Sequence, residues 1–122
     1  MGKTIISKDN RFEWDEDKNR INKKKHDGIS FELAVRVFLD EKRLDKYDTE
    51  HSTIYEERWN VIGRVEDILF VVYVEVNSRI RIISARKADK EETDEYYRNY
   101  DAQRIQSRFS HRYHSPYYPL RS

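Results

Sequence analysis

Arginine side chains are the groups in this sequence that could do chemistry most readily. The 122 residues contain 24 Lys+Arg, 23 Asp+Glu, four His and no Cys, so thiolate nucleophiles and thiolate metal ligands are excluded. The sequence has no glycine-rich phosphate loop and no motif for a serine triad. His111 and His114 are three residues apart but have no evident third ligand, and we therefore predict neither a metal nor a cofactor.

Guanidinium groups suit the chemistry of phosphate esters, because each carries a permanent charge and a planar fork of donors. RNA cleavage needs little more. The ribose 2′-hydroxyl attacks its own phosphorus, and fixed cations stabilise the charge that grows on the non-bridging oxygens. Losing one such donor typically costs about 3–4 kcal/mol, and a general acid or base contributes roughly 100- to 10,000-fold.

The same arginines could also hold a nucleic-acid backbone without cutting it. A non-catalytic nucleic-acid-binding or repressor subunit is therefore an alternative function, and a purely structural interaction module is a third. The formal charge of +1 is divided unevenly, as +2 over residues 1–28, −5 over residues 29–76 and +4 over residues 77–122. Basic ends around an acidic middle fit nucleic-acid contact in one place and a basic partner in another, and they also fit a well-solvated protein.

Apolar residues are too dispersed for a membrane protein. No apolar stretch approaches the ~20 residues of a membrane helix, and the first residues lack the apolar core of a signal peptide. We therefore expect a cytoplasmic protein that does not contact a membrane.

The pattern of apolar and polar residues predicts one α+β domain. The domain is expected over residues 11–100, after a flexible arm over residues 1–10 and before a tail over residues 101–122, whose order the sequence leaves open. Within the domain we expect two N-terminal helices packed on an antiparallel sheet of about four strands, followed by a C-terminal helix.

Capping residues mark the expected helices. Asp15 is a suitable N-cap, and the first helix runs from it to about His26. The second helix begins after Ser30 and carries a narrow apolar stripe made of Phe31, Ala34, Val35 and Phe38. Asp89 and Glu92 are spaced as a capping pair for the C-terminal helix.

Three consecutive strands give the clearest pattern, over residues 57–65, 68–76 and 79–86, and a weak edge strand is expected within residues 43–49. Two-residue turns between the three strands would place Trp59 opposite Val74, and Val74 opposite Arg81. This register predicts a mostly apolar face made of Trp59, Val61, Phe70, Val72, Val74, Ile83 and Ala85. It places Arg81 on that face and away from Arg86, unless a bulge turns the strand over. The opposite face mixes arginines, an amide, hydroxyls and aliphatic side chains, which favours a concave site or a partner-binding surface.

Several short motifs, in one order along the chain, resemble the BrnT toxin family. In the first half they are Phe12-Glu13-Trp14-Asp15, Asn22, Lys25-His26, Gly28 and Ser30-Phe31-Glu32. In the sheet they are Glu57-Arg58, Ile62-Gly63, Val71-Val72-Tyr73 and Arg81-Ile82-Ile83-Ser84-Ala85-Arg86. The resemblance spans about residues 11–97. It implies a small ribonuclease toxin of a type II toxin–antitoxin system with a RelE-like α+β fold, which would inhibit translation and growth.

The resemblance also implies partners and residue roles. The partner would be a BrnA-type antitoxin with a ribbon-helix-helix domain, and operator DNA would be bound only through the complex of the two proteins. The scissile phosphate of the RNA substrate would be handled by Arg58, Arg81 and Arg86. Supporting or proton-transferring groups would be Glu57, His26 and Tyr97, with Lys25 beside the substrate. The strand pattern adds Arg64 and Tyr73 as substrate-binding candidates.

Overall fold

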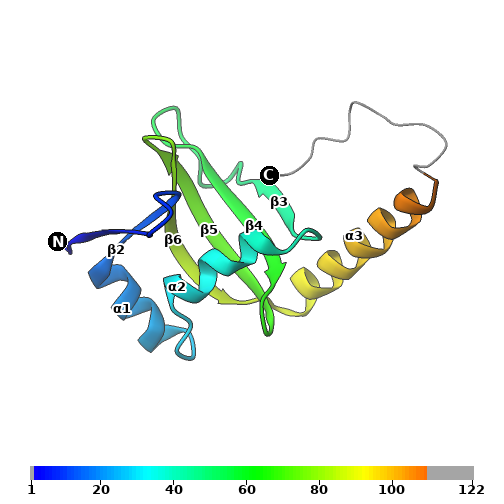
Figure 1. The fold of residues 1–122 in the computed structure, drawn as a ribbon, viewed down its shortest axis with the longest axis horizontal. Helices are drawn as coiled ribbons and strands as arrows, with labels where there is room; N and C mark the ends of the chain where they lie inside the picture. Colours follow the sequence, from blue (N-terminus) through cyan, green and yellow to red (C-terminus); the bar gives the residue numbers. More distant parts are fainter. Residues whose placement is uncertain (1, 110–122) are drawn as a thin grey trace.

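The computed structural model describes residues 2–109, in which six strands form one sheet in the order β1-β2-β6-β5-β4-β3 (Figure 1). The strands are β1 (Thr4–Ile6), β2 (Phe12–Asp15), β3 (Leu44–Tyr47), β4 (Arg58–Arg64), β5 (Ile68–Val76) and β6 (Arg79–Lys87). β2 runs parallel to β6, and the other neighbouring pairs are antiparallel. The sheet is therefore mixed.

Four helical segments accompany the sheet in the described part of the chain. They are α1 (Glu16–Lys25), α2 (Phe31–Ala34), the 3₁₀ helix η1 (Val35–Leu39) and α3 (Lys90–Phe109). In Figure 1, α2 and η1 cross in front of the strands, α1 lies beside them at the β2 and β6 side of the sheet, and α3 leaves the end of β6 and extends to the side. No helix within residues 2–109 is long and apolar enough to cross a membrane.

The predicted RelE-like arrangement, two N-terminal helices on an antiparallel sheet of about four strands, is wrong. Two strands precede α1, and the expected second helix is a single α turn that continues as η1. The segment expected to be a loose arm forms β1, where Ile5 pairs with Trp14 of β2. Past the expected domain boundary at residue 100, α3 continues to Phe109. The rest of the predicted tail, residues 110–122, lies outside the described residues.

Local capping explains where α1 and α3 begin. The Asp15 carboxylate accepts a hydrogen bond from the backbone N–H of Lys18 at 3.0 Å, which lowers the pKa of Asp15 below its ordinary value. Asp89 and Glu92 form the predicted capping box, each accepting from the backbone N–H of the other at 2.8 and 2.9 Å. These starts are set by residues within one turn, which is why the sequence predicts them.

Buried amides hold α1 against the sheet more than apolar side chains do. Its buried residues are Asn19 and Asn22. Asn22 donates to the carbonyl oxygens of Ile29 at 2.9 Å and Ala85 at 2.8 Å, and accepts from the Ala85 N–H at 3.2 Å. Asn19 accepts from the backbone N–H of Phe31 at 2.8 Å. α1 therefore fixes the part of β6 that lies beyond its short pairing with β2.

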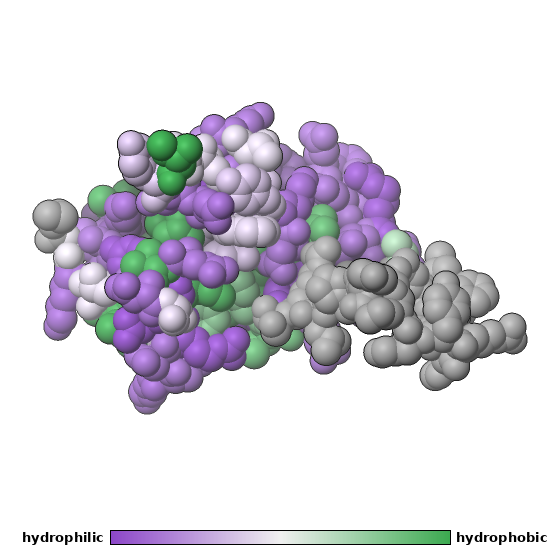
Figure 2. All heavy atoms as spheres, turned by 90° about the horizontal axis from the view of Figure 1, so that it is seen from above, coloured by the Kyte–Doolittle hydropathy of each residue, from purple (hydrophilic) through white to green (hydrophobic). Residues whose placement is uncertain are grey.

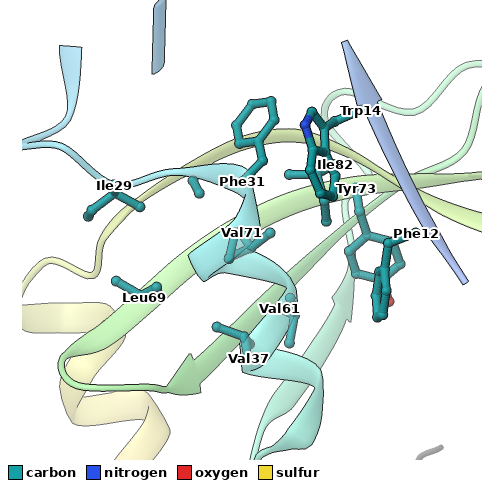
Figure 3. Close-up of a cluster of buried hydrophobic side chains, with 12 residues drawn as sticks. Phe12, Trp14, Ile29, Phe31, Val37, Val61, Leu69, Val71, Tyr73 and Ile82 are labelled. Atoms are coloured by element: carbon teal, nitrogen blue, oxygen red, sulfur yellow. The ribbon is translucent and has the colours of Figure 1, made fainter. Parts of the chain in front are cut away.

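The core lies between the α2–η1 segment and the sheet. Figure 3 shows Phe31 and Val37 of that segment lying against Val61 and Val71 of the central strands, and all four side chains are fully buried. η1 approaches β4 closely at Gly63, where an added Cβ would lie 2.5 Å from a methyl carbon of Val37. The view in Figure 2 shows a mostly hydrophilic surface with hydrophobic residues in small separate groups, in keeping with the 39% of charged residues.

The register of the sheet differs from the predicted one at its first hairpin. β4 and β5 are joined by a three-residue loop, because Arg64, and not Val65, pairs with Ile68. Every pair in this hairpin is therefore shifted by one residue, and Trp59 lies opposite Tyr73 instead of Val74. Because side chains alternate along a strand, the shift exchanges faces. Trp59 and Val61 lie on the face covered by α2. The predicted apolar face is wrong for Phe70, Val72 and Val74, and also for Ile83, which lines the opposite face with Phe70 and Val72.

The second hairpin has the predicted two-residue turn and one irregularity. Asn77 and Ser78 have φ values of 52° and 66°, which are typical of a tight turn between two strands. Val74 lies opposite Arg81 as predicted, but a bulge then inserts Ile83 so that Val72 pairs with Ser84.

Candidate functional site

The face of the sheet turned away from α1 and α2 gathers the arginines. The side chains that share it are Arg58, Asn60 and Arg64 on β4, Val72 and Val74 on β5, and Arg79, Arg81, Ser84 and Arg86 on β6. In a regular strand, Arg81 and Arg86 would point to opposite faces. The bulge at Ile83 adds one residue to the strand, which reverses the alternation of side chains after it and places both arginines on this face.

A hollow of about 520 Å³ opens on this face, bounded by β3 with the loop that follows it and by β6. Its charged and titratable lining residues are the cations Lys46, Arg58 and Arg86, the carboxylates Asp48 and Glu50, and Tyr47 and His51; Asn60 and Ser84 add neutral polar groups. Arg58 pairs with Val74 and Arg86 with Phe70, so the two arginines are two strands and four residues apart. Ideal strand spacings put their Cα atoms about 16 Å apart. They therefore reach the hollow from opposite corners, which suits a stretch of nucleic-acid backbone.

Arg86 is held by an ion pair with Glu92, a stacking contact with Phe70 and a hydrogen bond from Nη1 to the Lys87 carbonyl oxygen at 3.2 Å. Its Nη1 and Nη2 atoms donate to the two carboxylate oxygens of Glu92 at 2.7 and 2.8 Å, and its guanidinium stacks 4.3 Å from the centre of the Phe70 ring. The hydrogen bond to Glu92 raises the pKa of Arg86 above its ordinary value, against the opposing effect of burial. Glu92 belongs to the first turn of α3, so this helix positions the guanidinium at one end of the hollow.

Two other cations of the hollow are also paired. Lys46 donates to the Glu95 carboxylate of α3 at 2.9 Å, and Arg58 Nε donates to Glu56 at 2.9 Å. These pairs are substantially exposed, with 46% of the Lys46 side chain and 36% of the Arg58 side chain accessible. Exposed ion pairs are weak, typically under about 1 kcal/mol. A phosphate could therefore replace either carboxylate.

Arg81 is engaged elsewhere on the same face. It forms a short ion pair with the buried carboxylate of Glu13 on β2, and Arg79 lies 3.5 Å from the other oxygen of that carboxylate. Arg81 does not line the hollow. A buried carboxylate needs a partner, so Arg81 has a structural task where β2 joins β6.

The structure does not bring the remaining predicted site residues to the hollow. Exposed Lys25 ends α1, and half-buried His26 is its C-cap. Glu57 is exposed next to a separate depression beside Trp59. Tyr97 is 40% exposed on α3, and exposed Arg64 uses its backbone N–H to bind Asp40. Tyr73 is buried on the other face of the sheet, edge-on to the Phe38 ring.

Five charged or titratable lining residues, all from β3 and the loop after it, were not identified from the sequence: Lys46, Tyr47, Asp48, Glu50 and His51. His51 stands in a polar stretch without periodicity, and its only sequence cue is the spacing of Asp48 and His51, three residues apart, which occurs in many turns. His51 Nδ1 lies 2.8 Å from Asp48 Oδ2. Within residues 2–102, no cluster of three or more His, Asp or Glu side chains is arranged to hold a metal ion.

Comparison with known proteins identifies the family. Residues 14–92 match the family model described as the ribonuclease toxin, BrnT, of type II toxin–antitoxin systems. The chain belongs to the BrnT family. The matched segment contains both arginines of the hollow and ends at Glu92, the carboxylate that holds Arg86. The resemblance found in the sequence is thereby confirmed.

Comparisons with curated proteins and with solved structures add little to the family assignment. No curated protein matches the chain. Among solved structures, the crystal structure of the Brucella abortus ribonuclease toxin BrnT aligns at 28% sequence identity, covering 63% of this chain and 94% of that chain, with a TM-score of 0.47. As a BrnT-family ribonuclease toxin, this chain is a component of a type II toxin–antitoxin system.

Proposed function

We propose that this BrnT-family toxin cleaves RNA in the hollow between β3 and β6, without a metal ion. The observation that carries the proposal is the presence of Arg58 and Arg86, from separate strands, in the lining of one hollow on one face of the sheet. Lys46 adds a third cation to the lining. A nucleic-acid backbone is the ligand that such a set of cations fits best.

Arginines in the hollow would supply the electrostatic part of catalysis. The ribose 2′-oxygen attacks the adjacent phosphorus, the bond to the 5′-oxygen breaks, and the products are a 2′,3′-cyclic phosphate and a 5′-hydroxyl. Negative charge accumulates on the non-bridging oxygens, where a guanidinium donor is typically worth about 3–4 kcal/mol. Arg86 would exchange Glu92 for the phosphate while it keeps its stacking contact with Phe70.

The proposal includes the cellular context of the toxin. We expect a BrnA-type ribbon-helix-helix antitoxin to neutralise it in the cytoplasm, and operator DNA to be bound only by the complex of the two proteins. Free toxin would inhibit translation and growth by destroying RNA. These expectations follow from the BrnT motifs and not from the geometry of the hollow.

The test is Arg86→Ala, with Arg20→Ala as the matched control. Arg20 is exposed on α1 and paired with Asp17, so its loss removes the same charge far from the hollow. Induced alone in cells, the wild type and the control should stop growth and produce new RNA ends, and Arg86→Ala should lose both while it remains folded. With purified protein, cleavage should persist in excess EDTA.

A nucleic-acid-binding subunit without catalytic activity would give a different result. The wild type would bind RNA in a salt-sensitive way and would produce no new ends, and Arg86→Ala would only weaken that binding. Loss of cleavage in EDTA would refute the metal-independent mechanism while leaving the ribonuclease activity in place.

A further inference from the structure

The loop after β3 holds a histidine over the same hollow as the arginines. Its first residue, Asp48, donates its backbone N–H to the carbonyl oxygen of Arg58 at 2.9 Å. Ser52 closes the loop, because its Oγ accepts from the Arg58 N–H at 2.8 Å and its own N–H donates to the Asp48 carbonyl at 3.1 Å. The backbone of Arg58 therefore anchors both ends of the segment that carries His51.

Asp48 fixes the orientation of the His51 ring. Its Oδ2 atom lies 2.8 Å from His51 Nδ1, and its Oδ1 atom accepts from the backbone N–H groups of Glu50 at 3.1 Å and His51 at 3.2 Å. Burial acts to raise the pKa of Asp48, but these hydrogen bonds outweigh it, and the net pKa lies below its ordinary value. Asp48 is therefore an ionised acceptor at neutral pH.

The ionised carboxylate determines which nitrogen of the ring is available. A carboxylate only accepts hydrogen bonds, so Nδ1 must carry the hydrogen that it shares with Asp48. In neutral His51 the other nitrogen, Nε2, then has a free lone pair. Among the described residues, Nε2 has no hydrogen-bond partner, and 63% of the His51 side chain is accessible to solvent.

Charged and titratable groups surround His51 on several elements. They come from β3, from its own loop, from β4 and from β6, and are Lys46, Tyr47, Asp48, Glu50, Arg58 and Arg86. The cations among them would attract RNA to the hollow, and Asp48 is the carboxylate in contact with the ring. Histidine gains and loses a proton near neutral pH, which suits it to proton transfer.

We propose that His51 removes the proton from the ribose 2′-hydroxyl of the RNA, with Asp48 as its positioning residue. This inference rests on the proposed ribonuclease function. Neutral Nε2 takes the proton as the 2′-oxygen bonds to phosphorus and the 5′-oxygen leaves. The 5′-oxygen receives a proton from water, and His51 returns its proton to the solvent, so the step is balanced without an oxidant or reductant. Arg58 and Arg86 stabilise the phosphate, and Asp48 binds Nδ1 so that Nε2 is the nitrogen left to accept the proton.

The decisive variant is His51→Asn, because the Asn amide can still donate to Asp48 and preserve the loop. The assay is the single-turnover cleavage rate of a 5′-labelled, mixed-sequence single-stranded RNA across a pH series, with the full chain and with an all-2′-deoxy strand as the unreactive control. In the wild type the rate should fall as pH falls, because a general base that already carries a proton cannot accept one from the 2′-hydroxyl. His51→Asn should reduce the plateau rate roughly 100- to 10,000-fold and remove this acid limb.

A second variant separates positioning from folding. Asp48→Asn alone should lower the cleavage rate. It should lower the rate no further when His51→Asn is already present, because Asp48 acts through His51. Binding of the 2′-deoxy strand should stay unchanged in His51→Asn. If His51→Asn cleaves at the wild-type rate with the same acid limb while Arg86→Ala is inactive, the proton-transfer role is overturned and the ribonuclease proposal stands. If the wild type itself does not cleave, both are overturned.

Discussion

Replacing Asn22 by Ala tests whether a side-chain amide, and not apolar packing, holds α1 to the sheet. The substitution removes three hydrogen bonds and leaves the Ile29 carbonyl and both backbone groups of Ala85 without this partner. A buried polar group without a partner costs about 1–3 kcal/mol. At the low end of that range, we expect the free energy of unfolding to fall by about 3 kcal/mol, a large part of a typical total of about 5–15 kcal/mol.

Urea unfolding measures this loss directly, and the melting temperature should fall by about 12 °C at roughly 4 °C per kcal/mol. The neighbouring substitution Ile21→Ala is the control. Ile21 is 58% exposed on the same helix, so its loss should change stability by less than about 0.5 kcal/mol. If Asn22→Ala costs no more than Ile21→Ala, the amide bridge does not hold β6, and our account of how α1 is fixed to the sheet is wrong.

Three further predictions concern single side chains. Glu92→Gln should keep the helix cap but free Arg86, so RNA should bind more tightly, and the slope of log affinity against log salt should steepen by about 0.7 for one added phosphate contact, measured by fluorescence anisotropy. Gly63→Ala should lower the free energy of unfolding by about 1–3 kcal/mol in urea titrations, because its Cβ would lie 2.5 Å from a methyl carbon of η1. Burial and the hydrogen bond to Asp40 raise the pKa of Tyr96 well above its ordinary value. Stability from this group is therefore present below about pH 10 and lost as pH rises further, and this alkaline loss, followed by chemical unfolding, should shrink in Tyr96→Phe.

Features set by neighbouring residues were predictable from the sequence. The caps at Asp15, Ser30 and Asp89 follow from side chains that bind backbone groups within one turn. The turn at Asn77-Ser78 closes the second hairpin as expected. In contrast, the parallel pairing of β2 with β6 joins segments far apart in the chain and involves short strands, so no local pattern indicates it.

The register shows how a small local error spreads. Assigning two turn residues where the chain uses three moved every side chain of β4 to the wrong face relative to β5. The sequence could not decide between the two because Glu66 and Asp67 fit either loop. No residue type in β6 indicates the bulge at Ile83. The roles implied by the resemblance to BrnT proteins nevertheless required an irregularity in this strand, because Arg81 and Arg86 could not otherwise share a face.

The candidate site was only partly accessible to sequence reasoning. Arg58 and Arg86 were selected from the motifs, and the structure places both at one hollow. His51 was not selected, because its position depends on a loop that folds back to bind the backbone of Arg58. Tyr73 was selected from the strand pattern and lies in the core, since the shifted register reverses its direction.

The extra residue in β6 means that the face on which Arg86 lies depends on the number of residues in the strand. Side chains alternate between the two faces along β6, and this alternation reverses at Ile83. A relative with one residue fewer at this point would keep the same arginines but display them on opposite sides, and the helix that follows would depart on the other side as well. For proteins of this kind, the number of residues between two arginines is as informative as the arginines themselves.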